Sequence, residues 1–302
     1  MFDYFLYKFG QFLVLCLPRK MAYRIAVFIS DIHYLFANVD RANVRANLAA
    51  IFPEKPLKER DAIRLRMSRN FTKYLADFFK FSQIDAAYIK KYCRIENKHF
   101  IDDAAARGRG VIFLTAHIGN WELGGVVLAQ SGYDLWVVAL EHKNKKVNDF
   151  FDAQRESKGI HVIPFNKAVR QSIRVLKENR QLALVGDRDF TKDGGIIVDF
   201  FGKPTSIPKG PAALALKTGA LIIPGFFVRN PDDTFTLMIE PAIDPYPSGS
   251  QETDPEKNSF TQMSEKRLRE LTLQFTKIIE DYIRRYPDQW YMYRTFWVED
   301  KS

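Results

Sequence analysis

The segment VIFLTAHIGNWE, residues 111–122, decides the fold. Its apolar run is followed at once by His117, a tight Gly119–Asn120 turn and Glu122. If the run is a strand that extends to His117, the histidine lies at the carboxyl end, where open α/β sheets bind their ligands. Asn120 is suited to cap a following helix, which places Glu122 in the first turn of that helix. The segment therefore predicts a strand, a turn and a helix, with ionisable side chains at the edge of a sheet.

These two ionisable residues have two interpretations. In the first, the helix dipole keeps Glu122 ionised, and the carboxylate reaches the second ring nitrogen of His117 through the Gly119 turn. Such a carboxylate fixes the tautomer of the imidazole and stabilises the imidazolium, as a general base requires. In the second, His117 makes a backbone hydrogen bond at a strand end and Glu122 is an ordinary first-turn charge. The spacing alone leaves both open.

The rest of the chain predicts an α/β fold around the same segment. Apolar strand candidates alternate with helical patterns, which is typical of a mainly parallel central sheet flanked by helices. The strand candidates are 111–117, 135–141, 160–165, 182–187, 196–201, 221–229 and 235–240, and the helical patterns are 120–131, 144–158, 166–178 and 210–218. NPDD joins the last two strands as a hairpin, a polar loop follows at 245–258, and a long helix covers 259–286.

Residues 1–92 have a helical pattern instead, with a break at FPEKP, residues 52–56. We therefore divide the chain into an N-terminal helical, membrane-associating segment, 1–92, and an α/β domain with a C-terminal helix, 93–302. The apolar run at 9–17 has about half of the roughly 20 residues that a membrane-spanning helix needs. A pair of amphipathic helices at an anionic membrane surface is one interpretation, and a helical hairpin packed on the domain is the other.

Further polar residues follow the predicted strand at 182–187. Asp187, Arg188 and Asp189 come directly after an apolar run, so two strands of the sheet end in charged residues. Downstream, the aromatic pair Phe200 and Phe201 leads towards another helix start.

At that helix start, free N–H groups together with Lys209 are suited to hold a phosphate, although a well-capped helix packed on the sheet explains them equally well. Arg155 continues the buried stripe of Val147 and Phe151 on the helix at 144–158. A guanidinium on an apolar face is costly unless it meets an anion or a carboxylate, so Arg155 is a candidate for substrate binding or for an ion pair.

Composition limits the possible partners. The chain has 302 residues, a net charge of +9 and 14% aromatic residues, including 25 Phe. This charge favours an anionic membrane, a nucleic acid or an acidic protein. The basic residues are spread out and no nucleic-acid-binding motif accompanies them, so we expect no nucleic-acid partner. Cys16 and Cys93 form neither a CxxC motif nor a metal-ligand cluster, so we expect a reducing compartment and no metal.

Taken together, several segments resemble a known family. HIGNWE has the form of the HxxxxD/E acyltransferase motif, and RANVRANLAAIFPE resembles an N-terminal family signature. The remaining similar segments, in order, are TAHIGNWELGG, GDRDF, VDFFGKPTSIPKGPAALALKTGALIIP and YPDQWYMYRTFW. The set resembles the bacterial lipid A late (lauroyl/myristoyl) acyltransferases, a family that includes the phosphatidylinositol mannoside acyltransferases.

The resemblance implies a function. A fatty acyl group would move from acyl carrier protein or coenzyme A to a hydroxyl of a lipid A precursor or related glycolipid, at the cytoplasmic face of the inner membrane. His117 would be the general base and Glu122 its partner. Alternatives are a phosphatidylinositol mannoside or phospholipid acyltransferase, and a catalytically silent membrane-surface scaffold. Family members commonly have a membrane-spanning N-terminal helix, from which the short, interrupted run here departs.

The resemblance also implies roles for the remaining candidates. Arg155 would line the active site, and Asp187, Arg188 and Asp189 fall at the family's second charged motif. Arg155, Arg188 or Lys209 would bind acceptor phosphates or the phosphopantetheine arm of the donor. Phe200 and Phe201 are candidates for the acyl-chain groove. No cofactor is expected beyond the thioester co-substrate.

Overall fold

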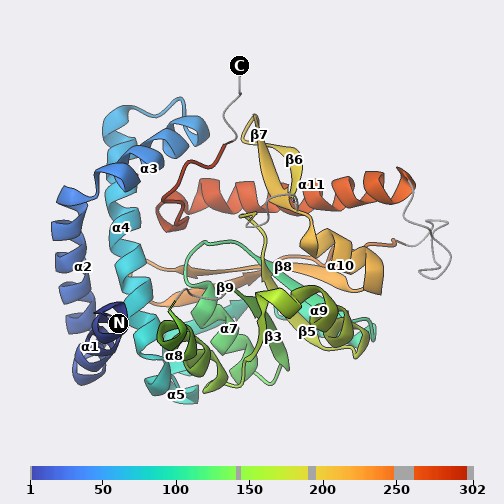
Figure 1. The fold of residues 1–302 in the computed structure, drawn as a ribbon, viewed down its shortest axis with the longest axis horizontal. Coiled ribbons are helices and arrows are strands. Elements are labelled where there is room, and N and C mark those ends of the chain that lie inside the picture. The colour runs from blue at the N-terminus through green and yellow to red at the C-terminus, as the bar shows by residue number, and fades with distance from the viewer. Residues whose placement is uncertain (1, 141–143, 190–194, 248–261, 298–302) are drawn as a thin grey trace.

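The computed structural model describes residues 2–140, 144–189, 195–247 and 262–297. A mostly parallel sheet lies at its centre (Figure 1). In spatial order its strands are β1 (Cys93–Glu96), β9 (Phe235–Ile239), β8 (Leu221–Arg229), β2 (Val111–Thr115), β5 (Gln181–Val185), β3 (Leu135–Ala139) and β4 (His161–Pro164). From β8 to β4 the strands are parallel, whereas β9 is antiparallel to β8 and β1 is parallel to β9. The predicted α/β class and the terminal hairpin are confirmed.

Helices cover both faces of the sheet because β2 is apolar on both sides. Val111 and Phe113 belong to one core, and Ile112 and Leu114 to the other. The first core lies under α6 (His99–Ala106), α7 (Trp121–Gln130) and α8 (Lys145–Glu156), and the second under α9 (Ala168–Lys177), α10 (Gly210–Thr218) and α11 (Gln262–Arg285). A strand buried on both faces reads as a continuous apolar run, which is why the segment at 111–114 marks the centre of the fold.

One strand assignment needs correction. The predicted strand at 196–201 lies outside the central sheet, because among the described residues β6 (Gly195–Phe200) pairs with β7 (Lys203–Pro208) alone, in an antiparallel hairpin. Residue 141, Phe190, and residues 248–261 of the predicted loop and last helix fall outside the described residues.

The N-terminal segment is helical as predicted. It consists of α1 (Phe2–Cys16), α2 (Arg19–Phe36), α3 (Asn38–Ile51), α4 (Leu57–Phe79), the 3₁₀ turn η1 (Phe81–Gln83) and α5 (Ala86–Tyr92). Figure 1 shows α4 between α2 and the rest of the molecule. The break at 52–56 separates α3 from α4, and β1 begins at Cys93, next to the proposed domain boundary.

Apolar side chains cover the outward face of α1 and α2. They recur every three or four residues, as expected for one side of a helix. The apolar helix face consists of Phe5, Leu6, Phe9, Phe12, Met21, Ile25, Phe28, Ile29, Ile32, Leu35 and Phe36, all exposed. The opposite face of α2 packs on α4 through Ala22, Tyr23 and Ser30, which are buried. None of the described helices is both long and apolar enough to cross a membrane.

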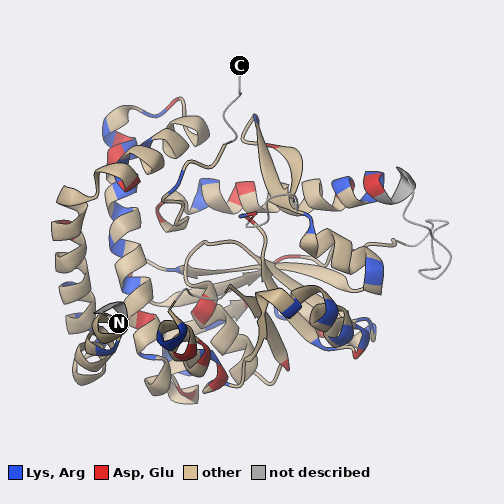
Figure 2. Cartoon of the chain, in the orientation of Figure 1, with Lys and Arg blue, Asp and Glu red and all other residues tan. Residues whose placement is uncertain are grey.

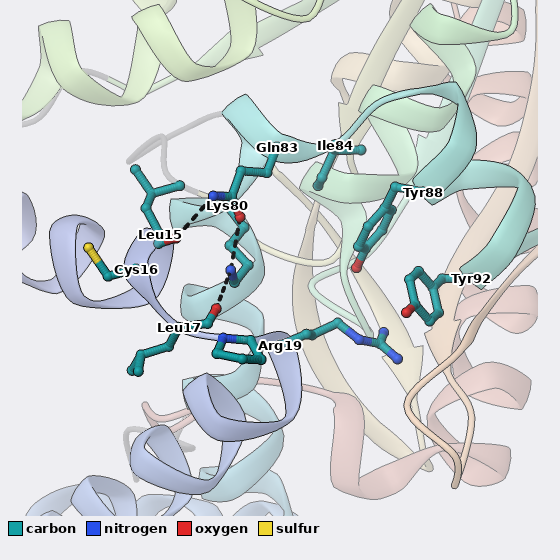
Figure 3. Close-up of a pocket in the computed structure, with 10 residues that line it drawn as sticks. Leu15, Cys16, Leu17, Arg19, Lys80, Gln83, Ile84, Tyr88 and Tyr92 are labelled. Atoms are coloured by element: carbon teal, nitrogen blue, oxygen red, sulfur yellow. Dashed lines mark hydrogen bonds between the residues drawn. The ribbon is translucent and has the colours of Figure 1, made fainter.

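The turn between α1 and α2 is tied to the end of α4 and to η1 by polar side chains (Figure 3). Lys80 Nζ donates to the Leu17 carbonyl over 2.9 Å, and Gln83 Nε2 donates to the Leu15 carbonyl over 3.0 Å. These carbonyls end α1 and have no partner within the helix, so the two bonds both satisfy them and fix α1 in place. A hollow of about 440 Å³ beside them is lined by Arg19 and Tyr88, among others, and His117 is not part of its lining.

Candidate active site

Strand register brings His117 and Asp187 together. Thr115 of β2 pairs with Val185 of β5, and each site residue lies two positions beyond its strand. The Asp187 Oδ1 atom lies 2.6 Å from His117 Nδ1 and accepts from the His117 backbone N–H over 3.2 Å. Parallel neighbours end at the same edge of a sheet, so the pairing follows directly from the fold.

The carboxylate of Asp187 is held ionised inside the protein. It is 0% exposed, and its Oδ2 accepts from the Trp290 indole N–H over 3.0 Å. Burial alone would raise its pKa, but His117, the Arg188 guanidinium and the Trp290 hydrogen bond together hold the pKa well below its usual range. Because the carboxylate is ionised, His117 Nδ1 carries the proton of the neutral ring and the lone pair belongs to Nε2.

The C-terminal segment braces this pair from behind. The Tyr291 N–H donates to the His117 carbonyl over 2.9 Å, and Arg188 donates to the Tyr291 carbonyl. Burial lowers the pKa of Arg188, and neighbouring Asp187 opposes that shift. The segment YPDQWYMYRTFW thus fixes both the histidine and its carboxylate, through Trp290 and Tyr291.

The carboxylate that holds His117 is therefore Asp187, and the predicted bond from Glu122 to the second ring nitrogen is wrong. Both oxygens of Glu122 accept from Arg155, over 2.6 and 3.0 Å, and both side chains are 13% exposed. The reason is the direction of the chain. After the Gly119 turn α7 runs away from the strand end, and its first turn faces α8, where Arg155 lies. Of the interpretations for Arg155, the structure shows the ion pair. Burial alone would lower the pKa of Arg155, but Glu122 raises it.

Two aromatic rings connect the two pairs. The Trp121 ring meets the His117 ring edge-on at 4.9 Å and stacks on Tyr74 of α4 at 4.5 Å. Burial and then Glu122 raise the pKa of Tyr74 well above its usual value, with Arg155 opposing. The site thus consists of a His–Asp pair and a Glu–Arg pair, joined by the rings of Trp121 and Tyr74, which together form the aromatic platform.

The backbone of the loop requires glycine at one position. Gly119 has φ +65°, and a Cβ atom there would lie 2.1 Å from the Phe227 carbonyl oxygen. The next residue, Asn120, donates its N–H to that carbonyl over 2.7 Å and accepts from Leu123 N–H over 3.0 Å. The predicted helix cap at Asn120 is confirmed, and the turn is pressed directly against β8.

The remaining predicted residues have contacts or positions of their own. Asp189 accepts from Ser206 over 2.9 Å and so faces the β6–β7 hairpin. Lys209 is exposed at the start of α10. Phe200 and Phe201 are buried, and Phe200 packs against Trp290 at 6.3 Å. Their acyl-chain and phosphate contacts stay predictions.

The sequence reasoning missed Tyr74, Trp121 and Trp290 as site residues. Trp121 and Trp290 lie inside segments that carry the family resemblance, which was an available signal. Tyr74 comes from α4, which the sequence reasoning assigned to the N-terminal segment.

This geometry agrees with the comparisons to known proteins. Residues 1–298 match the family model described as bacterial lipid A biosynthesis acyltransferase. The chain belongs to this family. The expected family and acyltransferase activity are confirmed.

The relatives of this acyltransferase have two kinds of name, phosphatidylinositol mannoside acyltransferase and lipid A biosynthesis acyltransferase. A phosphatidylinositol mannoside acyltransferase of Mycolicibacterium smegmatis is 28% identical over 98% of this chain and 91% of its own length. Another of the same name, from Mycobacterium tuberculosis, is 31% identical over 72% of this chain and 70% of its own length. A lipid A biosynthesis palmitoleoyltransferase of Escherichia coli is 21% identical over 83% of this chain and 77% of its own length.

Proposed function

We propose that this acyltransferase moves a fatty acyl group from a thioester of coenzyme A or acyl carrier protein to a hydroxyl of a glycolipid, with His117 as general base. The observation that carries the proposal is the 2.6 Å contact between His117 and buried Asp187 at the carboxyl edge of the sheet. A catalytically silent scaffold would not need a buried carboxylate on the histidine, since burying a charge is costly.

The chemistry follows from that pair. As the acceptor oxygen attacks the thioester carbonyl, His117 Nε2 takes the hydroxyl proton and Asp187 stabilises the imidazolium through Nδ1–H. The intermediate collapses, the C–S bond breaks, and the imidazolium returns the proton to the leaving thiolate. General base catalysis of this kind contributes about 10²–10⁴-fold.

The Glu122–Arg155 pair supports this step by holding the site in position. The pair fixes the first turn of α7 against α8, and this turn carries Trp121, whose ring lies beside the imidazole of His117. Arg155 is already neutralised by Glu122, and Arg188 lies beside Asp187 and donates to the Tyr291 carbonyl, so the exposed Lys209 is better suited to meet phosphates of the donor or acceptor. No cofactor takes part in the proposed step.

Among acceptors, we favour a phosphatidylinositol mannoside over a lipid A precursor. The relatives with the former name are 28% and 31% identical, whereas those with a lipid A name are 20% and 21% identical. The lipid A precursor remains the second candidate because the family model carries that description.

We further propose that the apolar helix face seats the enzyme on the cytoplasmic face of the cell membrane. Figure 2 shows α2 with few charged positions. Lys8, Lys20 and Arg24 are exposed on the same two helices, and the whole chain has a net charge of +9. Apolar side chains flanked by cations suit an anionic bilayer surface.

The test uses purified enzyme and phosphatidylglycerol vesicles that carry either acceptor. Lauroyl-, myristoyl- and palmitoyl-coenzyme A and the matching acyl carrier proteins are supplied as donors, and products are identified by mass spectrometry. We expect acylated phosphatidylinositol mannoside. A product only with the lipid A precursor would reverse the order of acceptors, and no product with any pair would contradict the proposal. Mass spectrometry of lipids from a deletion strain would show the missing chain and its position.

A further inference from the structure

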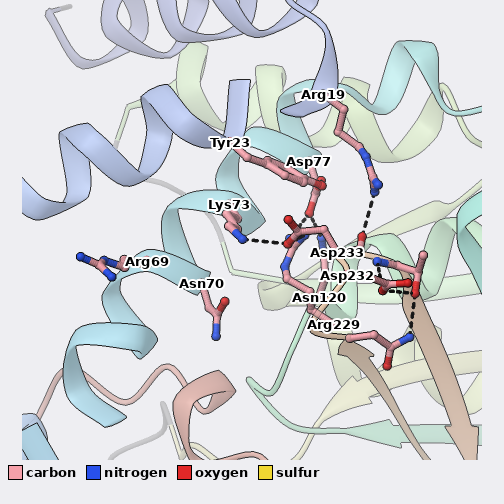
Figure 4. A network of polar contacts seen from close by, with 12 residues as sticks. Arg19, Tyr23, Arg69, Asn70, Lys73, Asp77, Asn120, Arg229, Asp232 and Asp233 are labelled. Carbon is pink, nitrogen blue, oxygen red and sulfur yellow. Dashed lines mark hydrogen bonds and ion pairs between the residues drawn. The ribbon is translucent and has the colours of Figure 1, made fainter. Parts of the chain in front are cut away.

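A buried polar network lies next to the catalytic loop, and the mechanism above does not use it (Figure 4). Its centre is Asp77 of α4, which is 1% exposed. The Asp77 carboxylate accepts from the Tyr23 hydroxyl, forms an ion pair with Arg229, and accepts from Asn120 Nδ2 over 2.9 Å. These partners come from α2, from the end of β8 and from the loop that carries His117.

The bond to Asn120 reaches the site directly. Asn120 lies between His117 and Glu122 in the sequence. Its amide oxygen caps α7, its N–H binds the Phe227 carbonyl, and its amide nitrogen binds Asp77. The tether to Asp77 is the one of these three that comes from the N-terminal segment, so it sets the loop relative to those helices.

The ion pair between Asp77 and Arg229 is buried. Arg229 has a side chain 5% exposed, and although burial alone would lower its pKa, Asp77 and Tyr23 raise it. A buried ion pair of this kind is weak evidence for stability, since apolar residues of similar volume often stabilise as well. Its three partners, however, fix the relative positions of three separate elements.

The bond to Tyr23 extends the network to the membrane side. Tyr23 is 3% exposed on the inner face of α2, opposite Phe28, which is 66% exposed on the apolar helix face. Two consecutive hydrogen bonds, Tyr23 to Asp77 and Asp77 to Asn120, therefore join the proposed membrane-seated helix to the loop of His117.

We propose that Asp77 is a positioning residue for acyl transfer, and that the chain Tyr23–Asp77–Asn120 sets the catalytic loop relative to α2. The proposal rests on the proposed function, because it assumes that His117 performs the chemistry. A misplacement of about 1 Å in reacting groups costs up to about 10²-fold in rate, so a loosened loop should lower kcat and leave the KM of the donor unchanged.

The experiment compares three small substitutions. Asn120→Ser keeps an oxygen to cap α7 but loses the bond to Asp77, and Tyr23→Phe removes only the hydroxyl that binds Asp77. Ser30→Ala is the matched control, because the buried Ser30 hydroxyl contacts the Ser68 hydroxyl over 2.9 Å, which joins α2 to α4 away from the loop.

We measure kcat and KM of the full chain on phosphatidylglycerol vesicles, with palmitoyl-coenzyme A and the acceptor found above. Amide hydrogen exchange of residues 117–123 is measured in parallel and does not depend on turnover. We expect kcat about 10–100-fold lower for Asn120→Ser and lower for Tyr23→Phe, with unchanged KM and faster loop exchange in both. Ser30→Ala should match wild type.

Wild-type kcat and loop exchange in both Asn120→Ser and Tyr23→Phe would overturn the proposal. So would a loss in Ser30→Ala as large as in Tyr23→Phe, because the effect would then be general loosening of α2. Undiminished turnover in His117→Ala would instead overturn the proposed function, and loop exchange would still decide whether the tether positions the loop.

Discussion

The Asp187 carboxylate stabilises the fold in a pH-dependent way. Its pKa in the protein is well below the usual value, mainly because His117 and Arg188 outweigh the effect of burial. A group of this kind stabilises the protein above its unfolded pKa, about 3.9, and loses that contribution as the pH falls further. Asp187→Asn should therefore lower the Tm at neutral pH, and the difference from wild type should shrink below about pH 4.

Thermal unfolding at a series of pH values measures this difference. The control is Asp149→Asn, because Asp149 is 55% exposed and pairs with Lys145 of the same helix, which is 86% exposed. A Tm difference for Asp187→Asn that does not change with pH would contradict the assignment of a buried, ionised carboxylate.

Arg155 and Glu122 should behave as one buried unit. Arg155→Met leaves the Glu122 carboxylate buried without its guanidinium, which costs about 3–5 kcal/mol of unfolding free energy. The double variant Arg155→Met/Glu122→Leu should lose much less. Urea unfolding measures all three, with Arg45→Met as the control, because the pair of Arg45 with Asp61 is 49% and 31% exposed and such pairs contribute at most about 1 kcal/mol. An equal loss in the single and double variants would argue against the pair.

At this scale the sequence predicted the histidine but not its carboxylate. Glu122 lies near His117 in the chain, which favours it as the partner of the histidine, but the direction of α7 carries it to Arg155 instead. Asp187 was recognised as a charged residue at a strand end. Its contact with His117 depends on β2 and β5 being neighbours in register, which local spacing does not reveal.

The loop between β2 and α7 depends on Gly119. Gly119→Ala forces a side chain into positive φ and a Cβ against the Phe227 carbonyl at 2.1 Å, so the loop must move. Gly132→Ala is the control, because Gly132 also has positive φ, +94°, but nothing lies within 4 Å. We expect a loss of about 1 kcal/mol in the control and a clearly larger loss in Gly119→Ala, together with lost turnover. Equal losses in the two variants would show that the contact with β8 does not matter.

The elements that the sequence predicted are those with strong apolar patterns. The strands near His117 and the helices between them were found within a few residues. β1, β7 and α6 were missed, for different reasons. CRIE in β1 is only four residues long, α6 is a short helix, and KPTSIP in β7 has two prolines and no apolar run, so its strand forms through pairing with β6.

At the scale of the whole molecule, the reactivity of the Cys16 thiol can report whether the apolar helix face contacts a membrane. Cys16 is exposed and continues the spacing of Phe5, Phe9 and Phe12 along α1. Burial, with Asp77 adding to it, raises the pKa of Cys93 to about 12, so its thiol is unreactive at neutral pH. Phosphatidylglycerol vesicles should therefore slow the reaction of Cys16 with a membrane-impermeant maleimide.

Two variants test whether the protection of Cys16 by vesicles depends on the apolar helix face. Phe9→Glu places a charge on the apolar helix face and should abolish the protection. Val169→Glu should retain it, because Val169, 72% exposed, lies on α9 rather than on that face. An unchanged Cys16 rate in the presence of vesicles would contradict the proposed membrane seating.

The N-terminal helices are more closely connected to the site than their sequence suggests. The helical pattern of residues 1–92 predicts a separate membrane-associating segment. In the structure α4 supplies Tyr74 to the aromatic platform and Asp77 to the catalytic loop. Such contacts between distant segments come from the packing of complete helices, and neither periodicity nor motifs indicate them.

The most direct test is turnover of His117→Ala compared with His161→Ala. His161 is the matched control, because its side chain on β4 is 52% exposed and pairs with Asp134 away from the site. Transfer from palmitoyl-coenzyme A to phosphatidylinositol mannoside is followed by mass spectrometry, with circular dichroism to confirm folding. We expect His117→Ala to lose at least about 10²-fold in kcat and His161→Ala to match wild type. Wild-type turnover in folded His117→Ala would contradict the account.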